Sequence, residues 1–560
     1  MKRPDIKLYE VEKIETVKEM LEKAVKAAGE KNAFEFKKEG SKEITKVTYK
    51  EFKKRTEELG TALATVGMVD KHIAVIGENS YDWLTVYLTV LQSNGVIVPI
   101  DKELTCNEIV NVLKSSDSEV LFYSNRYEKY IDLIKEEVPA IKYFIEFQRD
   151  EDAGHKLAYE KFIEKGRTEL EKGNIDFTSI EHKDTNVLKM LVYTSGTTDM
   201  PKGVMLTEHN LVSCVNYGLQ VATVYTKSLS VLPYHHTYEA VAGILVALHK
   251  HVTICINDSL KNVLSNLQLY KPDYIYLVPA FAEVFYKNIW NNAKKTKKEF
   301  GLKVLIVLSN FLRKLGIDKR RTLFKSVHNA FGGNLREIIV GGAPLRAELG
   351  KFFDSIGIPL YNGYGITECS PLVSVNREGF NDPATVGVVL PCCEIKFENM
   401  TEDGYGEICV KGDIVMKGYY KDTVRTERVL KDGWFNTEDY GKFNDKGQLL
   451  ITGRKKNMIV LNNGKNIYPE EIENYILAVP YVTEVVVRGI KNDSNQEVGL
   501  KAEVFLNKTK VEELAIENVQ ETLQKDIAKV TRELPVYKHI TEIEIREKEF
   551  EKTTTNKIRR

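Results

Sequence analysis

The sequence predicts an α/β protein, with a large N-terminal domain of parallel-rich sheets and helices and a small α+β domain at the C-terminal end. Two observations carry this prediction. Through the first two thirds of the chain, short apolar runs bounded by Gly alternate with amphipathic stretches of helical length, which is typical of βαβ units around a mainly parallel sheet. After residue 454 a separate segment combines alternating strands with a charged helical stretch.

The elements follow from the local patterns in chain order. Helices are expected at 80–95, which ends at the stop signal Asn94-Gly95, and at 107–117. Strands are expected at 72–77, 96–100, 118–124, 252–256, 274–279 and 336–342. From residue 385 closely spaced strands with Gly-rich turns predict a β-rich subdomain over 385–454, which completes the large domain, 1–454. The domain 455–560 is expected to hold strands at 482–490, 499–507 and 539–546, with a long helix near 510–533.

Composition narrows the classes of function. The 560 residues contain 80 Lys and Arg against 80 Asp and Glu, and this zero net charge argues against a general nucleic-acid-binding surface. No apolar run is long enough to span a bilayer, and the first 30 residues lack the apolar core of a secretory signal. The seven Cys include no C-x-x-C, which favours reduced thiols in the cytoplasm.

The strongest local signal is LVYTSGTTDMPKG, residues 191–203. Small residues let backbone N–H groups converge on an anion, hydroxyl groups add donors, and a lysine adds charge. The candidate polyphosphate ligands are Thr194, Ser195, Gly196, Thr197, Thr198 and Lys202. Because no Ser or Thr follows Lys202, the segment is not the common P-loop, which argues against a kinase or GTPase. An ordinary Gly/Thr turn is the alternative interpretation.

This segment resembles the phosphate loop of the adenylate-forming superfamily, which includes acyl-CoA synthetases, luciferases and peptide-synthetase adenylation domains. Alone, each further motif would be assigned to a turn or to solvated charge, but all of them follow in the order of that family. They are LPYHHTYE (232–239), REIIVGGAP (336–344), YNGYGITECSP (361–371), GWFNTEDYG (433–441), ITGRKKNMIVLNNGKNIYPEEIE (451–473) and FEKTTTNKIRR (550–560). Asp199, Glu438 and Asn556 stand where the family usually has Gly.

The resemblance implies a role for each matching residue. His236 would border the acyl pocket, Thr367 would bind phosphate, and Glu368 would bind Mg²⁺ as a hard oxygen ligand. Asp439 and Arg454 would contact the ribose. In the C-terminal domain, which the resemblance implies to be mobile, Lys456 would be the hinge, Gly464 would line the coenzyme A channel, and Lys557 would reach the α-phosphate. The adenine would lie against Gly341, Gly342, Ala343, Pro344, Asn362, Gly363, Tyr364 and Gly365, with Tyr364 stacked on the base.

The implied reaction is ATP-dependent activation of a fatty acid to acyl-AMP, with release of pyrophosphate, followed by transfer to coenzyme A. Two anions must meet in the first step, and like charges about 4 Å apart repel by about 4 kcal/mol at an effective dielectric near 20. Mg²⁺ on Glu368, the Lys202 ammonium and Lys557 would offset that repulsion. Two alternatives stay open: an acyl-AMP ligase that loads an acyl carrier protein, and a catalytically inactive nucleotide-binding relative.

Within the superfamily the chain most resembles long-chain acyl-CoA synthetases. The resemblance lies in the strand and helix over 276–290 and in the basic insertion 294–333. The expected partners are therefore a fatty acid, ATP, Mg²⁺ and coenzyme A, and no nucleic acid. The insertion mixes apolar and basic residues, which permits peripheral contact with a membrane surface. The alternative is a pair of helices packed on the large domain.

Overall fold

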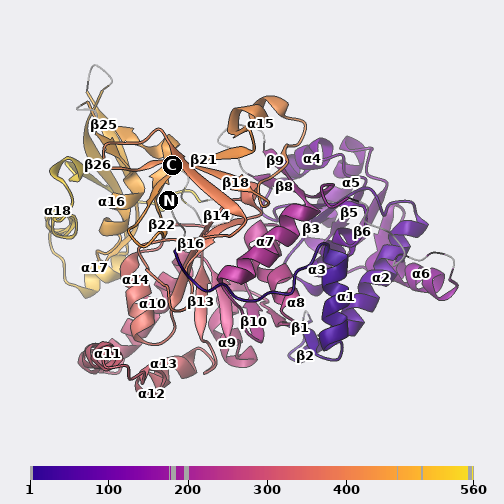
Figure 1. Ribbon diagram of the computed structural model, residues 1–560, viewed down its shortest axis with the longest axis horizontal. Helices are drawn as coiled ribbons and strands as arrows, with labels where there is room; N and C mark the ends of the chain where they lie inside the picture. Colours follow the sequence, from indigo (N-terminus) through magenta and orange to yellow (C-terminus); the bar gives the residue numbers. More distant parts are fainter. Residues whose placement is uncertain are drawn as a thin grey trace. The chain divides into compact units, whose positions relative to one another are not determined.

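The computed structural model describes residues 4–38, 40–173, 175, 177, 184–194, 201–462, 465–492, 496–552, 558 and 560. Contacts divide the chain into two compact units. The first consists of residues 1–394 and 411–435, and the second consists of 395–410 and 436–560. Each unit has its own sheets and helices (Figure 1).

The first unit contains a nine-stranded sheet whose central strands are parallel. The outer strands at both edges of the sheet pair antiparallel with their neighbours. The strand order is β16 (Val388–Val389), β15 (Leu372–Val375), β14 (Leu360–Gly365), β13 (Glu337–Val340), β12 (Tyr274–Leu277), β10 (Lys227–Ser230), β11 (Thr253–Ile256), β1 (Asn32–Lys37) and β2 (Ile44–Thr48). Tyrosine and β-branched residues dominate β11, β12 and β13, whose two faces are both buried, as expected for parallel strands covered by helices.

A second sheet of the first unit has eight strands, and it ends on one side in an antiparallel hairpin and a short added strand. The hairpin is formed by β8 and β9, and the short strand is β19. The order is β19 (Gly418–Tyr419), β9 (Lys202–Thr207), β8 (Leu188–Thr194), β4 (Val96–Pro99), β3 (His72–Ile76), β5 (Val120–Tyr123), β6 (Tyr143–Glu146) and β7 (Lys156–Ala158).

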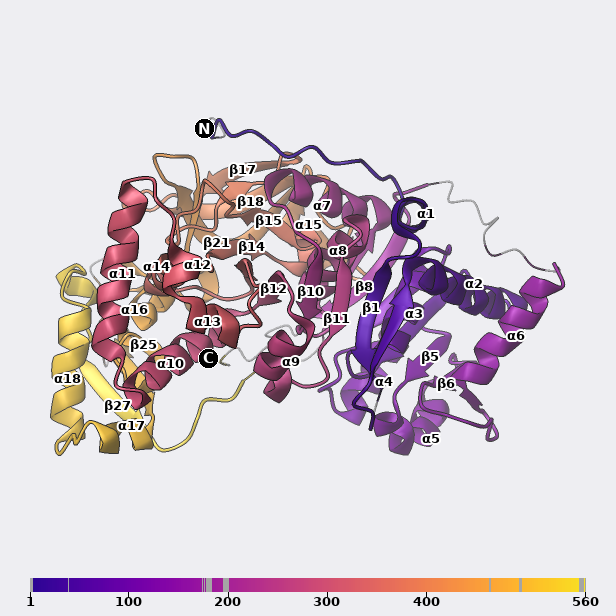
Figure 2. The same ribbon diagram turned by 90° about the horizontal axis from the view of Figure 1, so that it is seen from below.

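Helices cover these sheets and bury their apolar faces in separate cores. Figure 2 shows α6 lying beside α2 within the first unit. The helix α2 begins with a capping box, in which Thr48 and Glu51 satisfy each other's backbone N–H groups. The helices are α1 (Val17–Ala28), α2 (Tyr49–Thr65), α3 (Tyr81–Leu91), α4 (Cys106–Ser115), α5 (Glu128–Glu137), α6 (Tyr159–Glu171), α7 (Glu208–Val221), α8 (Val246–His249), α9 (Val263–Tyr270), α10 (Pro279–Lys295), α11 (Glu299–Lys314), α12 (Arg320–Leu323), α13 (Lys325–Ala330), α14 (Ala347–Ser355) and α15 (Thr423–Val429).

The second unit combines a β-rich part with the C-terminal α+β segment. The chain passes from one unit to the other within three strands, which are β17 (Cys393–Glu398), β18 (Gly406–Gly412) and β21 (Trp434–Phe443). The remaining elements are β22 (Leu449–Arg454), β23 (Ile459–Val460), β24 (Asn466–Ile467), α16 (Pro469–Ile476), β25 (Val482–Lys491), β26 (Glu497–Leu506), α17 (Lys508–Glu513), α18 (Val519–Val530) and β27 (Glu542–Arg546).

The predicted fold class is confirmed, and one predicted element is wrong. The single helix expected near 510–533 is two helices, α17 and α18. The chain leaves the helical conformation at Ala515, whose φ is 49°, and the Asn518 side chain then caps α18 by accepting from the backbone N–H of Glu521. No helix among the described residues is long and apolar enough to cross a bilayer.

Candidate functional site

The predicted phosphate loop lies in the sequence between β8 and β9, which pair antiparallel. Its two ends are paired, since Thr194 lies opposite Lys202 in the register. The residues between them include Ser195, Gly196, Thr197, Thr198 and Asp199, which lie outside the described residues. The Lys202 ammonium nitrogen lies 5.4 Å from the centroid of the Tyr419 ring, within the range of a cation–π interaction. The hairpin therefore places the predicted phosphate-binding cation against an aromatic ring.

The same tyrosine holds the predicted metal ligand. Glu368 lies in a short 3₁₀ turn, η5 (Thr367–Cys369), directly after β14. The Tyr419 hydroxyl donates to Glu368 Oε1 at 2.8 Å, and the Met416 N–H donates to the Glu368 carbonyl at 2.8 Å. Because β19 pairs with β9, one buried residue brings Lys202 and Glu368 together. Sequence reasoning missed Tyr419, whose short Gly-Tyr-Tyr string was interpreted only as part of the β-rich region.

The Glu368 side chain fits the chemistry of a magnesium ligand. It is half-buried, and its Oε1 atom already accepts the phenolic hydrogen bond. Mg²⁺ binds oxygen ligands and commonly uses one or two protein carboxylates together with substrate phosphates. A carboxylate that accepts a hydrogen bond from a hydroxyl group is held in one orientation. Glu368 can thus hold the ion, with Lys202 available for the phosphates.

The glycines predicted to face the adenine lie where backbone segments approach closely. Gly341 and Gly342 follow β13 directly, and Gly342 has a φ of 81°, which favours glycine. A Cβ atom on Gly341 would lie 3.2 Å from the Tyr238 ring and 3.4 Å from the Gly363 carbonyl oxygen. Ala343 and Pro344 continue the same loop. The structure therefore brings this loop beside β14.

Strand β14 carries the remaining predicted adenine residues. Tyr364 is buried next to the last residue of the strand, and Asn362 donates from Nδ2 to the Thr385 carbonyl at 3.2 Å. Gly365 has no room for a side chain, because a Cβ there would lie 2.2 Å from the carbonyl oxygen of Pro371. The path of β14 into the turn of Thr367 and Glu368 thus depends on this glycine.

The segment after β10 contains two histidines and a buried acid. The His235 and His236 rings lie 4.3 Å apart, and burial lowers the pKa of His235 to about 3. Glu239 lies in a π-helix, η3 (Tyr238–Leu245), and accepts from the Ser230 hydroxyl. Complete burial raises the Glu239 pKa from its ordinary value of 4.5 to about 8. At neutral pH both His235 and Glu239 are therefore uncharged. Sequence reasoning did not single out Glu239.

We expect the Glu239→Gln variant to lose part of the pH dependence of folding stability. Between about pH 4.5 and 8 the folded protein keeps a proton that the unfolded chain releases, so stability falls as pH rises, by at most about 1.4 kcal/mol per pH unit. A glutamine stays neutral throughout. Urea unfolding at about pH 5 and about pH 8 should show a stability difference, variant minus wild type, that grows with pH. The raised pKa values of Asp82, Glu337 and Glu473 affect both proteins and cancel in this difference. Equal pH slopes would contradict the assignment.

The predicted ribose residues pair with each other in the second unit. Asp439 on β21 lies opposite Arg454 on β22, and Arg454 Nε lies 3.2 Å from Asp439 Oδ1. Asp439 is buried, while Lys456 is exposed in the short 3₁₀ turn after β22. Glu438 adopts a φ of 59°, which costs an L-residue roughly 1–2 kcal/mol and explains the glycine usual there. The predicted residues Gly464 and Lys557 lie outside the described residues.

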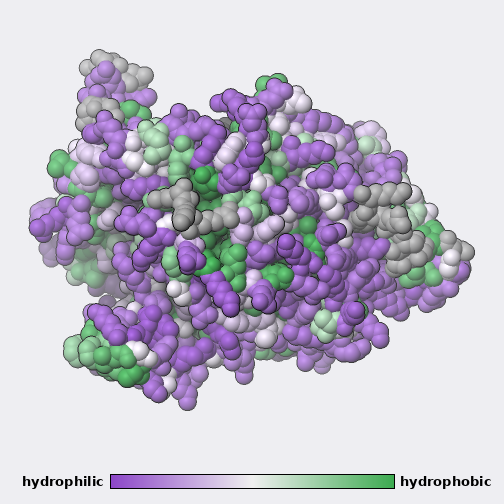
Figure 3. All heavy atoms as spheres, viewed as in Figure 1, coloured by the Kyte–Doolittle hydropathy of each residue, from purple (hydrophilic) through white to green (hydrophobic). Residues whose placement is uncertain are grey.

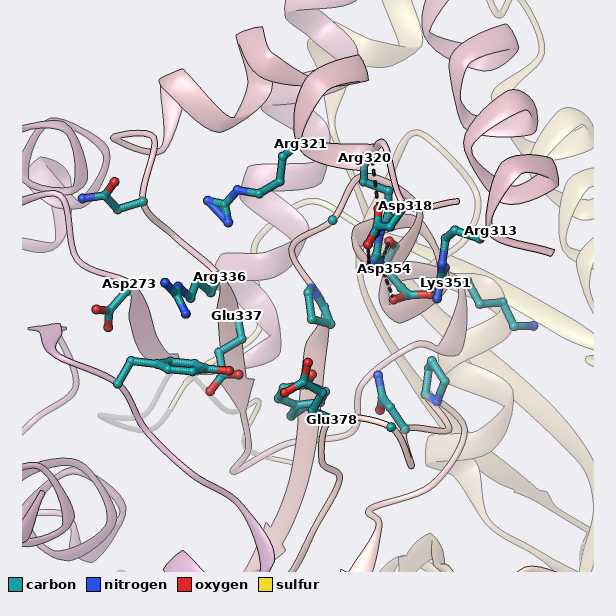
Figure 4. Close-up of a pocket in the computed structure, with 18 of the residues that line it drawn as sticks. Asp273, Arg313, Asp318, Arg320, Arg321, Arg336, Glu337, Lys351, Asp354 and Glu378 are labelled. Carbon is teal, nitrogen blue, oxygen red and sulfur yellow. Dashed lines mark hydrogen bonds and ion pairs between the residues drawn. The ribbon is translucent and has the colours of Figure 1, made fainter. Parts of the chain in front are cut away.

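A cavity of about 1190 Å³ lies at the end of the nine-stranded sheet where the central strands β12 and β13 begin. It is lined by Asp273 and Arg336, which precede β12 and β13, whereas the predicted adenine loop follows β13. Figure 4 shows that some of the charged side chains that line the cavity form ion pairs with one another. Arg313 lies 2.6 Å from the Asp354 carboxylate, and Arg320 lies 3.0 Å from the same group. Those predicted nucleotide-binding residues that the structure describes do not line this cavity.

Two family profiles match most of the chain. Residues 21–420 match the profile described as AMP-binding enzyme, and residues 456–560 match AMP-binding enzyme C-terminal domain. Long-chain-fatty-acid–CoA ligase FadD15 of Mycobacterium bovis is 29% identical over 466 residues, covering 80% of this chain and 75% of that protein. Fatty acyl-CoA synthetase B of Dictyostelium discoideum is 29% identical over 526 residues, covering 86% and 76%.

Solved structures share the fold at lower identity. The anthranilate CoA ligase AuaEII, in complex with anthranoyl-AMP, matches with a TM-score of 0.76 at 19% identity, over 100% of this chain and 97% of that chain. A fatty acyl CoA synthetase of Mycobacterium tuberculosis matches with a TM-score of 0.64 at 21% identity, over 97% and 96%.

Proposed function

This chain belongs to the AMP-binding enzyme family of the adenylate-forming superfamily, and from that premise we propose that it activates a long-chain fatty acid as acyl-AMP and transfers the acyl group to coenzyme A. Support comes from relatives named long-chain-fatty-acid–CoA ligase and fatty acyl-CoA synthetase, each spanning most of the chain. The observation that carries the proposal is that Tyr419 contacts both Lys202, which lies over its ring, and Glu368, which accepts from its hydroxyl.

The proposed first step joins the fatty-acid carboxylate to the α-phosphorus of ATP and releases pyrophosphate. Mg²⁺, when bound at Glu368, supplies charge neutralisation on the phosphate oxygens. Lys202 adds a positive charge at the hairpin, which lowers the repulsion between the two anions. The neutral Glu239 adds no negative charge to the segment that carries His236, which we propose borders the acyl group. No side-chain nucleophile is required, because the substrate carboxylate itself attacks.

Pyrophosphate release with a panel of carboxylic acids tests this proposal. The purified protein, supplied with ATP and Mg²⁺, is assayed with acetate, benzoate, octanoate and palmitate. We expect the largest kcat/KM with palmitate, because each buried methylene adds about 0.8 kcal/mol of apolar transfer free energy. Preference for acetate or benzoate would refute the long-chain assignment while leaving adenylation intact. Absence of pyrophosphate with every acid would refute the adenylation itself.

We propose that the second step follows a rotation of the C-terminal segment about Lys456. This rotation would withdraw Lys557 from the α-phosphate and bring Gly464 to the coenzyme A thiol. The exposed position of Lys456 directly after β22 supports the assignment, because a hinge needs room for its backbone to change. A Lys456→Pro variant restricts φ there, and we expect it to slow thioester formation at least about tenfold more than pyrophosphate release. Equal losses in both half-reactions would refute the hinge.

A further inference from the structure

Helix α11 presents apolar side chains on two opposite sides. One side packs into the core of the first unit, where Leu302 is 8% exposed and Leu305 and Ile306 are partly buried. The other side faces solvent, and five large apolar residues on it are 40–79% exposed. They are Phe300, Val304, Val307, Leu308 and Phe311, and we call them the α11 apolar face. Leu315, 60% exposed, extends the face just past the end of the helix.

The α11 apolar face is one continuous stripe. At 100° per residue, its members fall within an arc of about 100° on the helix surface. Figure 3 shows them as a green patch at the lower left, where Figure 1 places α11. Apolar residues scattered singly on a surface need no explanation, whereas a contiguous stripe of this kind marks an interaction site.

Cations surround this stripe. Residues 287–325 contain twelve lysines and arginines against two carboxylates, a net charge of +10, although the whole chain is neutral. Six exposed lysines flank the helix, and none of these described lysines lies within 4.0 Å of a carboxylate. Those before the helix are Lys294, Lys295, Lys297 and Lys298, and those after it are Lys314 and Lys319.

We propose that the α11 apolar face and its flanking lysines dock the protein on the surface of an anionic lipid bilayer. The helix would lie in the plane of the interface, with Phe300, Val307 and Phe311 among the acyl chains. The lysines at both ends would contact lipid phosphates, as expected for an interfacial amphipathic helix. An acidic bilayer matches both the apolar stripe and the positive charge.

The charge argues against a second copy of this chain as the occupant. A two-fold symmetric contact through α11 would bring the same +10 segment against itself. A nucleic acid would pair with the lysines but would leave the exposed phenylalanines and valines in water. The docking itself does not depend on the proposed reaction. Only its consequence does, namely that a fatty acid dissolved in the bilayer would reach the enzyme without crossing water.

Flotation of the full-length protein with lipid vesicles tests this inference without substrate. The vesicles consist of phosphatidylcholine alone or of phosphatidylcholine mixed with phosphatidylglycerol. We expect binding to rise with the phosphatidylglycerol fraction and to fall with added salt. The double variant Val307→Asp, Phe311→Asp should reduce binding at least about tenfold. Replacing Lys294, Lys295, Lys297 and Lys298 by Gln should abolish the preference for the anionic vesicles.

Matched controls distinguish binding through the α11 apolar face from nonspecific adsorption to vesicles and from misfolding of the variants. Val424→Asp on α15, where the valine is 81% exposed, should bind vesicles as the wild type does. Circular dichroism and urea unfolding confirm that each variant is folded. Equal binding by the wild type and the α11 double variant would overturn the proposal. A dimer that the double variant dissociates, without vesicle binding by the wild type, would also overturn it and would assign the face to a second copy. Loss of vesicle binding with pyrophosphate release retained would separate docking from catalysis.

Discussion

Replacement of Glu368 by Gln is expected to lower the rate of pyrophosphate release by about 100-fold or more, the range seen when a preorganised electrostatic group is removed from an active site. The amide has nearly the shape of the carboxylate, and its oxygen can still accept from the Tyr419 hydroxyl, so the fold should not change. Only the negative charge that we propose holds Mg²⁺ is lost. Initial rates measured against magnesium concentration should show a higher apparent magnesium requirement as well as a lower maximum.

The Tyr419→Phe variant is the matched control for this experiment. It keeps the aromatic ring beside Lys202 and the charge on Glu368, and removes only the hydrogen bond that the Tyr419 hydroxyl donates to Glu368. We expect a smaller loss, about tenfold, that high magnesium partly restores, because the carboxylate is present but less well oriented. A loss in Glu368→Gln no larger than in Tyr419→Phe would contradict the role of Glu368 as the metal ligand. Unchanged kinetics in Tyr419→Phe would show that the hydroxyl does not position it.

The second large effect is expected from Gly365→Ala. The added methyl would lie 2.2 Å from the Pro371 carbonyl oxygen, a backbone atom that cannot move without disrupting the pairing of β14 with β15. We expect the free energy of unfolding in urea to fall by about 3 kcal/mol or more. Activity should fall as well, because Thr367 and Glu368 follow directly in the same turn.

Gly218→Ala is the control for this steric argument. Gly218 lies inside α7, and its added methyl would meet only the Leu372 side chain, at 3.5 Å, an ordinary contact distance. Alanine favours a helix over glycine, so we expect stability to stay equal or to rise by about 0.5–1 kcal/mol. Similar destabilisation in both variants would mean that the crowding at Gly365 is relieved by small shifts and that the glycine is not required there.

Local patterns were sufficient to predict the elements that are short, apolar and bounded by Gly. The strand expected at 72–77 is β3, the helix expected at 80–95 is α3, and the strand expected at 336–342 is β13. The structure brings the loop at Gly341 close to Gly363 on the strand of Tyr364, and the adenine-binding roles of these residues stay predictions. These features depend on neighbouring residues in the chain or on motifs that are themselves contiguous.

Tyr419 could not be found in this way, because its importance comes from pairing between distant residues. Its strand, β19, contains two residues, and it lies opposite Val204 only after the chain has folded. The protonated state of Glu239 likewise results from burial by surrounding elements. The break between α17 and α18 was missed because the charged pattern continues through it, while Asn518 supplies a new cap. The domain boundary at 454 and the roles of Ser195, Gly464 and Lys557 stay predictions.

The double contact of Tyr419 has a consequence for how the protein responds to nucleotide. Because folding already orders a lysine and a glutamate around one phenol ring, little further rearrangement of these two side chains is needed when a polyphosphate arrives. When heat or a mutation breaks the pairing of β19 with β9, we therefore expect the affinity for the metal–nucleotide complex to fall first. This should occur at temperatures where the sheets of the first unit are still intact.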